Sequence, residues 1–180
     1  MNKLNLGCGQ FPLHEYVNLD FIVLPGVDIV HDLNVYPYPF NDNEFDEVRC
    51  FHVLEHLNDI IAPLEEIWRI TKSGGIVSIE VPSFPGVGAI VDPTHKQFYT
   101  YGTFDYFSKE SQFKYYSKAK FLIERREIIF ESKLFPFSFL NTVLNYIINK
   151  SSKLQRVYFY NFSYLYPSSI IGVRLVVEKS

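Results

Sequence analysis

The segment Leu4-Asn5-Leu6-Gly7-Cys8-Gly9 decides the fold of this chain. Its apolar residues alternate with a polar one, which is typical of a strand, and the strand runs directly into a turn with two glycines. The next strand-like segment, Tyr16-Val17-Asn18-Leu19-Asp20, ends on a carboxylate. In a doubly wound sheet the ligand lies outside the carboxyl ends of the strands, so we expect the glycine turn and Asp20 to belong to one site.

Strand-like and helix-like segments alternate over the first hundred residues, which predicts an α/β fold with a mainly parallel sheet. Besides the two strands above, the expected strands are residues 27–30, 45–51, 75–81, 121–130 and 170–177. A helix is expected at residues 63–72, where Leu64, Ile67 and Trp68 share one face. Gly74 stands where the left-handed residue that ends such a helix is expected.

Length and composition indicate a single domain, residues 1–180, with 47% hydrophobic residues. Such a chain needs no disulfides to bury a core, because a domain of ~150 residues already hides about 68–70% of its unfolded surface. No apolar run approaches the roughly 18–20 residues needed to cross a bilayer, and no signal-peptide pattern precedes the first strand. Only Cys8 and Cys50 are present, without CxxC spacing. We expect a soluble, cytoplasmic protein with two reduced thiols.

Charge is distributed unevenly along the chain. Residues 1–100 hold five basic and 14 acidic side chains and residues 101–180 hold 12 basic and six acidic ones, for a formal net charge of −3. This mild acidity argues against a nucleic-acid partner. The difference between the halves indicates either different roles or only solvated lysines and arginines around an aromatic core.

An insertion is expected before the last strand, at residues 136–167. Its predicted helix has an apolar stripe made of Leu140, Val143, Leu144, Ile147 and Ile148. The aromatic run of residues 158–166 follows. The insertion is a lid, a homodimer interface or additional core. The other face of the helix carries asparagine and threonine in place of a row of lysines or arginines, which disfavours binding to a membrane surface.

The glycine turn departs from the dinucleotide-binding fingerprint. That fingerprint, GxGxxG, needs a third glycine where this chain has Pro12, and an acidic residue roughly 20 residues further on, whereas Asp20 follows Gly9 by 11 residues. A pyrophosphate is poorly supported, which argues against NAD. A cofactor with an amino acid attached to its nucleoside fits better, because the ionised Asp20 carboxylate can accept hydrogen bonds from both hydroxyls of a ribose.

Five motifs in order resemble those of the class I S-adenosylmethionine-dependent methyltransferases, in particular the compact type 11 members. The resemblance covers residues 3–101. The motifs are the glycine turn, the acidic strand end at Asp20, residues 31–48, His52-Val53-Leu54-Glu55-His56-Leu57 and residues 66–75. It implies a Rossmann-like, doubly wound, mainly parallel seven-stranded sheet with an antiparallel last strand and a helical, aromatic insertion before it.

The resemblance also implies S-adenosylmethionine as the cofactor. The residues that it places around this cofactor are Gly7, Cys8, Gly9, Asp20, Asp32, Leu33 and Phe51. The glycine turn and the backbone near Phe51 would take the methionine part, Asp20 the ribose, and Asp32 with Leu33 the adenine. Only residues 10–16 separate the glycines from the second strand, fewer than the ~10–12 of a full crossover, so we expect a first helix reduced to about a turn and a more open pocket.

Methyl transfer from a sulfonium is an in-line displacement, in which alignment of donor and acceptor alone can contribute about 7–11 kcal/mol. A hydroxyl acceptor also needs a base, for which His95 is the candidate, with Asp92 placed to hold its tautomer. A loop-ordering hydrogen bond is the alternative for His95.

His52 and Tyr99 are candidate substrate contacts, although Tyr99 can equally fill the core. His56 is expected to be structural, and because the histidine spacing matches no tight ligand motif, no metal is expected.

The sequence thus predicts S-adenosylmethionine-dependent methyl transfer to a small-molecule or glycan acceptor. Oxygen is the preferred acceptor atom, because relatives of this compact type look like enzymes of surface-polysaccharide or lipid-linked sugar metabolism. Two alternatives are a non-catalytic nucleoside-binding module and an NAD-dependent oxidoreductase. The identity of the acceptor is open at this point.

Overall fold

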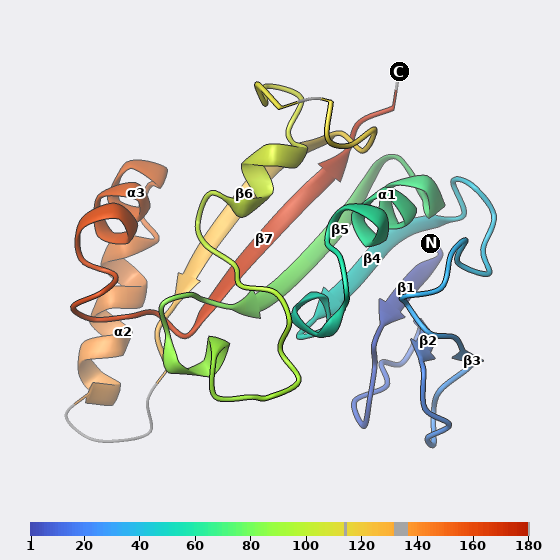
Figure 1. Cartoon of the computed structure of the whole chain (residues 1–180), viewed down its shortest axis with the longest axis horizontal. Coiled ribbons are helices and arrows are strands. Elements are labelled where there is room, and N and C mark those ends of the chain that lie inside the picture. Colours follow the sequence, from blue (N-terminus) through green and yellow to red (C-terminus); the bar gives the residue numbers. More distant parts are fainter. Residues whose placement is uncertain (114, 132–136, 180) are drawn as a thin grey trace.

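The structure, a computed structural model, describes residues 1–113, 115–131 and 137–179. A seven-stranded sheet forms its centre, in the order β3-β2-β1-β4-β5-β7-β6 (Figure 1). The strands are β1 (Lys3–Leu6), β2 (Val17–Asp20), β3 (Ile29–Val30), β4 (Phe45–Phe51), β5 (Thr71–Pro82), β6 (Phe121–Ile129) and β7 (Ile170–Val177). Strands β1 to β5 pair in parallel, whereas β7 is antiparallel to both of its neighbours. The predicted doubly wound sheet with an antiparallel last strand is confirmed.

Helix α1 (Ile61–Ile70) covers β4 and β5 on one face of the sheet (Figure 1). Its Leu64, Ile67 and Ile70 are fully buried and belong to the same core as Val48 of β4 and Val77 of β5. Burial of each such side chain contributes about 1.5–3 kcal/mol. The predicted apolar face of this helix therefore provides much of the support for the two central strands.

The boundaries of α1 differ from the predicted residues 63–72. The helix begins at Ile61, because the Asp59 carboxylate accepts hydrogen bonds from the N–H groups of Ile61 and Ala62 at 3.0 and 2.9 Å. It ends at Ile70, after which the backbone is extended. Gly74 has a positive φ of 77° but lies within β5, so its predicted place at the end of the helix was wrong.

No helix lies between β1 and β2, which confirms that the first crossover is reduced. Side-chain amides bind the backbone of this loop instead. The Asn18 carboxamide accepts a hydrogen bond from the Leu13 N–H at 2.8 Å and donates to the Leu13 carbonyl at 3.0 Å. Asn5 donates to the Asn18 Oδ1 at 3.0 Å. Because both asparagines are buried, these bonds satisfy backbone groups that a helix would otherwise have paired.

The insertion forms two helices, α2 (Phe137–Ile148) and α3 (Ser152–Asn161), which lie beyond the β6 edge of the sheet (Figure 1). Pro136, where the insertion was predicted to begin, lies outside the described residues. None of the described residues of α2 or α3 lines the two cavities of the candidate site below. The lid interpretation is therefore not supported by this arrangement.

The polar face of α2 lies against the sheet. Asn149, in the turn directly after the helix, accepts from the Ile128 N–H at 2.9 Å and donates to the Ile128 carbonyl at 2.7 Å. Asn145 makes the same pair of bonds with Phe130, at 2.8 and 3.0 Å. The asparagines thus occupy the positions of a neighbouring strand, which protects the free edge of β6.

The sequence argument against membrane-surface binding assumed that these asparagines face solvent, and this assumption was wrong. Leu140 and Ile147 are about two-fifths exposed, whereas Asn141 is buried. Among the described residues, no helix is long and apolar enough to span a membrane.

Candidate functional site

A cavity of about 320 Å³ lies at the carboxyl ends of β1 and β2. Gly7, Asp20, Asp32 and Leu33 line it, so the fold brings together four of the residues predicted to bind the cofactor. The volume is in the range of small-molecule sites, which run from roughly 300 to 1,000 Å³. Cys8 is buried and does not line the cavity, so that only its backbone is placed to contribute.

The glycine turn leaves no room for a side chain at its first position. A Cβ on Gly7 would lie 2.3 Å from a methyl carbon of Val53, and its φ is +64°. Gly9 also has a positive φ, of 50°, and its N–H donates a hydrogen bond to the Asp20 Oδ2 at 2.8 Å. The turn and the carboxylate were predicted to form one site, and this hydrogen bond joins them directly.

Asp20 fits the ribose of a nucleoside cofactor. Its side chain is 6% exposed, and its Oδ1 accepts a second hydrogen bond from the Ile22 N–H at 3.1 Å. A carboxylate has about four acceptor positions, so two backbone donors leave others free for a pair of hydroxyls. The backbone bonds fix the orientation of the carboxylate toward the cavity that it lines.

Asp32 and Leu33 form the opposite wall, on the loop that follows β3. The Asp32 carboxylate accepts hydrogen bonds from the backbone N–H and the side-chain amide of Asn34, at 2.9 and 3.0 Å, and these bonds hold its pKa below the ordinary value. Leu33 is buried and offers an apolar surface. An apolar wall beside a fixed acceptor suits a heteroaromatic base with an exocyclic amine.

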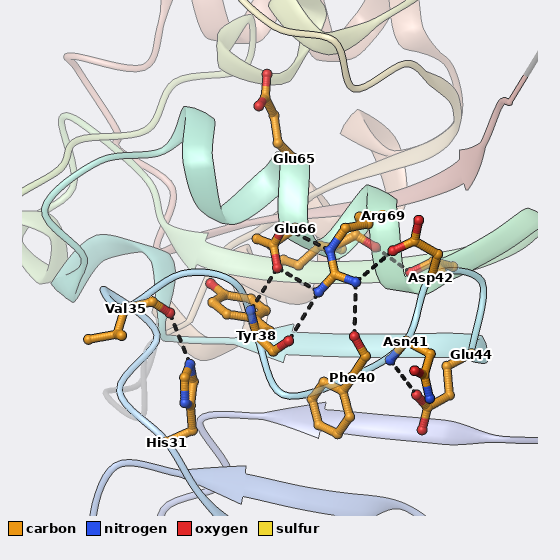
Figure 2. Close-up of polar contacts among 12 residues, drawn as sticks. His31, Val35, Tyr38, Phe40, Asn41, Asp42, Glu44, Glu65, Glu66 and Arg69 are labelled. Carbon is orange, nitrogen blue, oxygen red and sulfur yellow. Dashed lines mark hydrogen bonds and ion pairs between the residues drawn. The ribbon is translucent and has the colours of Figure 1, made fainter.

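Glu66 and Arg69 of α1 fasten this loop to the helix (Figure 2). The Arg69 guanidinium donates to the carbonyls of Tyr38 and Phe40 at 3.1 and 2.9 Å and to the Asp42 carboxylate at 2.7 Å. Glu66 accepts from the Tyr38 N–H at 2.7 Å and from Arg69 at 2.8 and 2.9 Å. In the figure Glu65, the residue before Glu66 in the helix, points away from this group.

The side chains of Phe51 and Tyr99 are not placed to contact a cofactor or a substrate in either cavity. The Phe51 ring lines a separate hollow on the other face of the sheet, and the Arg49 guanidinium lies 3.9 Å from its centroid. Only the backbone of Phe51 could therefore contact the methionine part of the cofactor, as the resemblance implies. Tyr99 is 1% exposed and stacks on Phe104, with ring centroids 6.0 Å apart. The structure places Tyr99 in the core.

A second cavity, of about 450 Å³, adjoins the first and shares His52 and His56 with it. It lies beyond the carboxyl end of β5, where Asp92 and His95 line it together with Glu55. His52 has a positive φ of 55°, a strained conformation for a residue with a side chain. The Glu55 carboxylate, 3.4 Å from the His52 Nδ1, raises the pKa of His52.

Asp92 does not orient His95 as expected. The two side chains are 3.8 Å apart at closest, and the His95 Nδ1 instead bonds the Ala89 carbonyl at 3.1 Å. Asp92 accepts from the hydroxyl and the N–H of Thr94, at 2.6 and 2.8 Å, which lowers its pKa. The carbonyl therefore fixes the tautomer of His95, while Asp92 orders the loop.

Comparisons with known proteins agree with this geometry. Residues 4–79 match the family described as "Methyltransferase domain". A 44-residue segment is 50% identical to an uncharacterized methyltransferase of Schizosaccharomyces pombe. This match covers 24% of the chain and only 16% of that relative. Over residues 4–79 the chain is therefore similar to methyltransferases.

Solved structures show how much of the chain shares its fold with known proteins. An S-adenosylmethionine-dependent methyltransferase from Mesorhizobium loti aligns with a TM-score of 0.57 at 13% identity, over 97% of this chain and 90% of that one. One from Archaeoglobus fulgidus aligns with a TM-score of 0.56 at 17% identity, over 97% and 85%. At these identities the likeness shows the fold, which extends well beyond the matched motifs.

Sequence reasoning assigned no role to several residues of this candidate site. Lys96 lines the first cavity and donates to the Asn58 side chain at 2.8 Å. Glu66 and Arg69 stood within a quoted motif, and their spacing of three residues on a helix signals an ion pair. Glu55 gave no signal beyond its motif, because its burial depends on packing that the sequence does not reveal.

Proposed function

We propose that this protein is a methyltransferase, which transfers the methyl group of S-adenosylmethionine to a hydroxyl of a small-molecule or glycan acceptor. The observation that carries the proposal is the pair of adjoining cavities, which meet at His52 and His56. The first cavity holds the residues suited to a nucleoside. The second, next to it, offers room for an acceptor.

The cofactor, when bound, supplies an electrophilic methyl group on a positively charged sulfur. This chain's residues would bind it through Asp20 at the ribose, through Asp32 and Leu33 at the adenine, and through the backbone of the glycine turn at the amino-acid end. The same contacts would fix its orientation, and such alignment is the main requirement for an in-line displacement.

The second cavity is polar where it adjoins the first, which favours a hydroxylated acceptor. His95 offers its Nε2 as a hydrogen-bond acceptor, because the Ala89 carbonyl can bind the Nδ1 only if that nitrogen carries the proton. A hydroxyl that binds there would be held and made more nucleophilic. In this arrangement His95 is the catalytic candidate, and Asp92 keeps the loop of His95 in place.

The test is calorimetric titration of the purified protein with S-adenosylhomocysteine. Binding is expected, and Asp20→Asn should weaken it by at least about tenfold, because the variant loses an ionised acceptor. Asp46→Asn, at the other end of the sheet, serves as the matched control. Equal affinities for the wild type and the Asp20 variant would contradict the assignment. A larger rise in melting temperature with NAD(H) than with S-adenosylhomocysteine would favour an oxidoreductase.

Catalysis is tested separately, by transfer of a labelled methyl group to hydroxylated sugars and small molecules. Cofactor binding without transfer to any of these would favour the non-catalytic alternative.

A further inference from the structure

Glu55, His56 and His95 form a compact cluster at the junction of the two cavities. Glu55 and His56 belong to the short helical turn Leu54–His56 that follows β4, whereas His95 comes from the loop that follows β5. Each offers one metal-ligand atom, and the three atoms lie within 4.8 Å of one another. We propose that these side chains bind a divalent transition-metal cation, which holds the oxygen of the acceptor. The role of the cation, but not its binding, rests on the proposed function.

The first supporting observation is the state of Glu55. Its side chain is 1% exposed, and neither carboxylate oxygen has a hydrogen-bond partner among the described residues. The nearest cationic group is the half-exposed His52 ring, at 3.4 Å. Buried carboxylates in proteins are normally paired, hydrogen-bonded or coordinated to a metal, whereas this one has no hydrogen bond and pairs only with that half-exposed imidazole among the described residues. A bound cation would compensate its charge.

The second observation is the tautomer of His56. The Thr94 hydroxyl donates to the Asp92 carboxylate at 2.6 Å, which uses its single proton. The Thr94 oxygen, 2.9 Å from the His56 Nδ1, must then accept the proton of that nitrogen. The His56 Nε2 is left with a free lone pair.

His95 follows the same pattern, since the Ala89 carbonyl accepts from its Nδ1. Both rings therefore have one nitrogen tied to an acceptor and the other free. This is the arrangement in which metal-binding histidines are commonly held. Two imidazoles and a carboxylate suit Zn²⁺, Mn²⁺ or Fe²⁺ better than Mg²⁺ or Ca²⁺, which prefer oxygen ligands.

The spacing of these residues in the sequence predicted no metal. The prediction missed this cluster because His95 reaches Glu55 and His56 only through the fold. The Lys96 and Gln97 N–H groups bond the Glu55 carbonyl at 2.7 and 3.2 Å, which fixes the loop of His95 to the turn of Glu55.

The cation would take part in the reaction as an anchor for the acceptor. Three protein ligands leave coordination positions open, and a hydroxyl oxygen of the acceptor would fill one of them in place of a contact with His95. During transfer, the bond from the methyl carbon to sulfur breaks with its electron pair going to sulfur. The new bond forms to the hydroxyl oxygen, whose proton is released to water in the second cavity.

The test is calorimetric titration of the chelator-treated protein with ZnCl2 and, separately, MnCl2. We expect one tight site in the wild type. His95→Ala and Glu55→Gln should each weaken it by about tenfold or more, and Thr94→Val, which removes the partner of the His56 Nδ1, by about tenfold. His14→Ala, an exposed histidine outside the cluster, is the matched control. Glu55→Gln keeps the shape of the side chain, and its melting temperature without metal should not fall below that of the wild type.

The proposal would be overturned by absence of binding in the wild type, or by equal affinities in the wild type and the Glu55→Gln and His95→Ala variants. A marked loss of metal-free melting temperature in Glu55→Gln would indicate a structural carboxylate and also contradict it. Titration with S-adenosylhomocysteine, done in parallel on the metal-free protein, separates the two proposals. Cofactor binding without a metal site refutes the cation alone, and a metal site without cofactor binding refutes the proposed function.

Discussion

Single residues connect the walls of the first cavity, which is proposed to bind the cofactor. Asp20 fixes the glycine turn through Gly9 while it keeps free acceptor positions toward the cavity. On the opposite wall, Glu66 and Arg69 tie the backbone of the loop that carries Asp32 and Leu33 to α1. The shape of the cavity therefore depends on a small number of hydrogen bonds whose loss can be measured.

Gly7 is the residue at which a methyl group should be least tolerated. Gly7→Ala adds a carbon 2.3 Å from Val53 at a φ of +64°. The left-handed backbone costs roughly 1–2 kcal/mol and the overpacking about 1–3 kcal/mol. We expect the free energy of unfolding, measured with urea, to fall accordingly. Gly88→Ala, where nothing lies within 4 Å of the added carbon, should change it by less than about 0.5 kcal/mol.

Glu66 should make stability depend on pH. Burial raises its pKa, but the bonds from Arg69 and the Tyr38 N–H together outweigh burial and hold the pKa below 4.5. A carboxyl with a lowered pKa contributes stability above its unfolded value, and that contribution is lost as the pH falls through the folded value. Glu66→Gln should therefore be less stable than the wild type at pH 7, by about 3 kcal/mol.

The difference between the wild type and Glu66→Gln should shrink below pH 4.5. Denaturation by urea at several pH values measures it. Glu110→Gln, at an exposed position, is the control. A pH-independent difference would show that the Glu66 charge has no role.

At the level of elements, α2 replaces a missing eighth strand. Asn145 of α2 and Asn149, in the turn directly after it, bind the backbone of Phe130 and Ile128 at the end of β6. Gln155 of α3 continues the series by donating to the Arg126 carbonyl at 2.7 Å. Side-chain amides from two successive helical segments thus bind the backbone along this edge at Phe130, Ile128 and Arg126.

Asn149→Ala should expose this edge. The variant leaves the N–H and carbonyl of Ile128 without partners, which costs about 1–3 kcal/mol for each buried group that stays unsatisfied. Hydrogen exchange should become faster at the Ile128 amide, and the free energy of unfolding should fall. Asn161→Ala, at an exposed asparagine of α3, should leave both unchanged. Unaltered exchange at Ile128 in Asn149→Ala would refute the role of the asparagine pair.

At the scale of the whole molecule, the insertion presents an apolar surface away from both cavities. Phe139 and Tyr146 of α2 and Tyr160 of α3 are each about 70% exposed. The homodimer expected from the sequence stays a prediction, and this surface is where we place it. Light scattering should give the mass of a dimer for the wild type and of a monomer for Phe139→Ser with Tyr146→Ser. A monomeric wild type would refute it, and Tyr115→Ser, at another exposed ring, controls for lost aromatic surface.

Much of the architecture could be predicted from the sequence because alternation and turn residues are local signals. The strands with an apolar pattern, such as β4 and β7, have the predicted bounds. The aromatic run after α2 gave no clear helical period, so α3 was missed.

In the candidate site, the glycine turn and Asp20 could be predicted because they follow two successive strands in a known order of motifs. The orientation of His95 and the burial of Glu55 could not, because they depend on contacts between distant segments.

The openness of the first cavity bears on the order of catalytic events. Phe21, which follows β2 and lines this cavity, is 68% exposed, so the cavity reaches bulk water along a wall to which His95 does not contribute. The demethylated cofactor would then dissociate by this route while the methylated acceptor remains bound. An acceptor with several hydroxyls would be methylated processively, more than once in each binding event. Products with a single methyl group would then be scarce early in the time course.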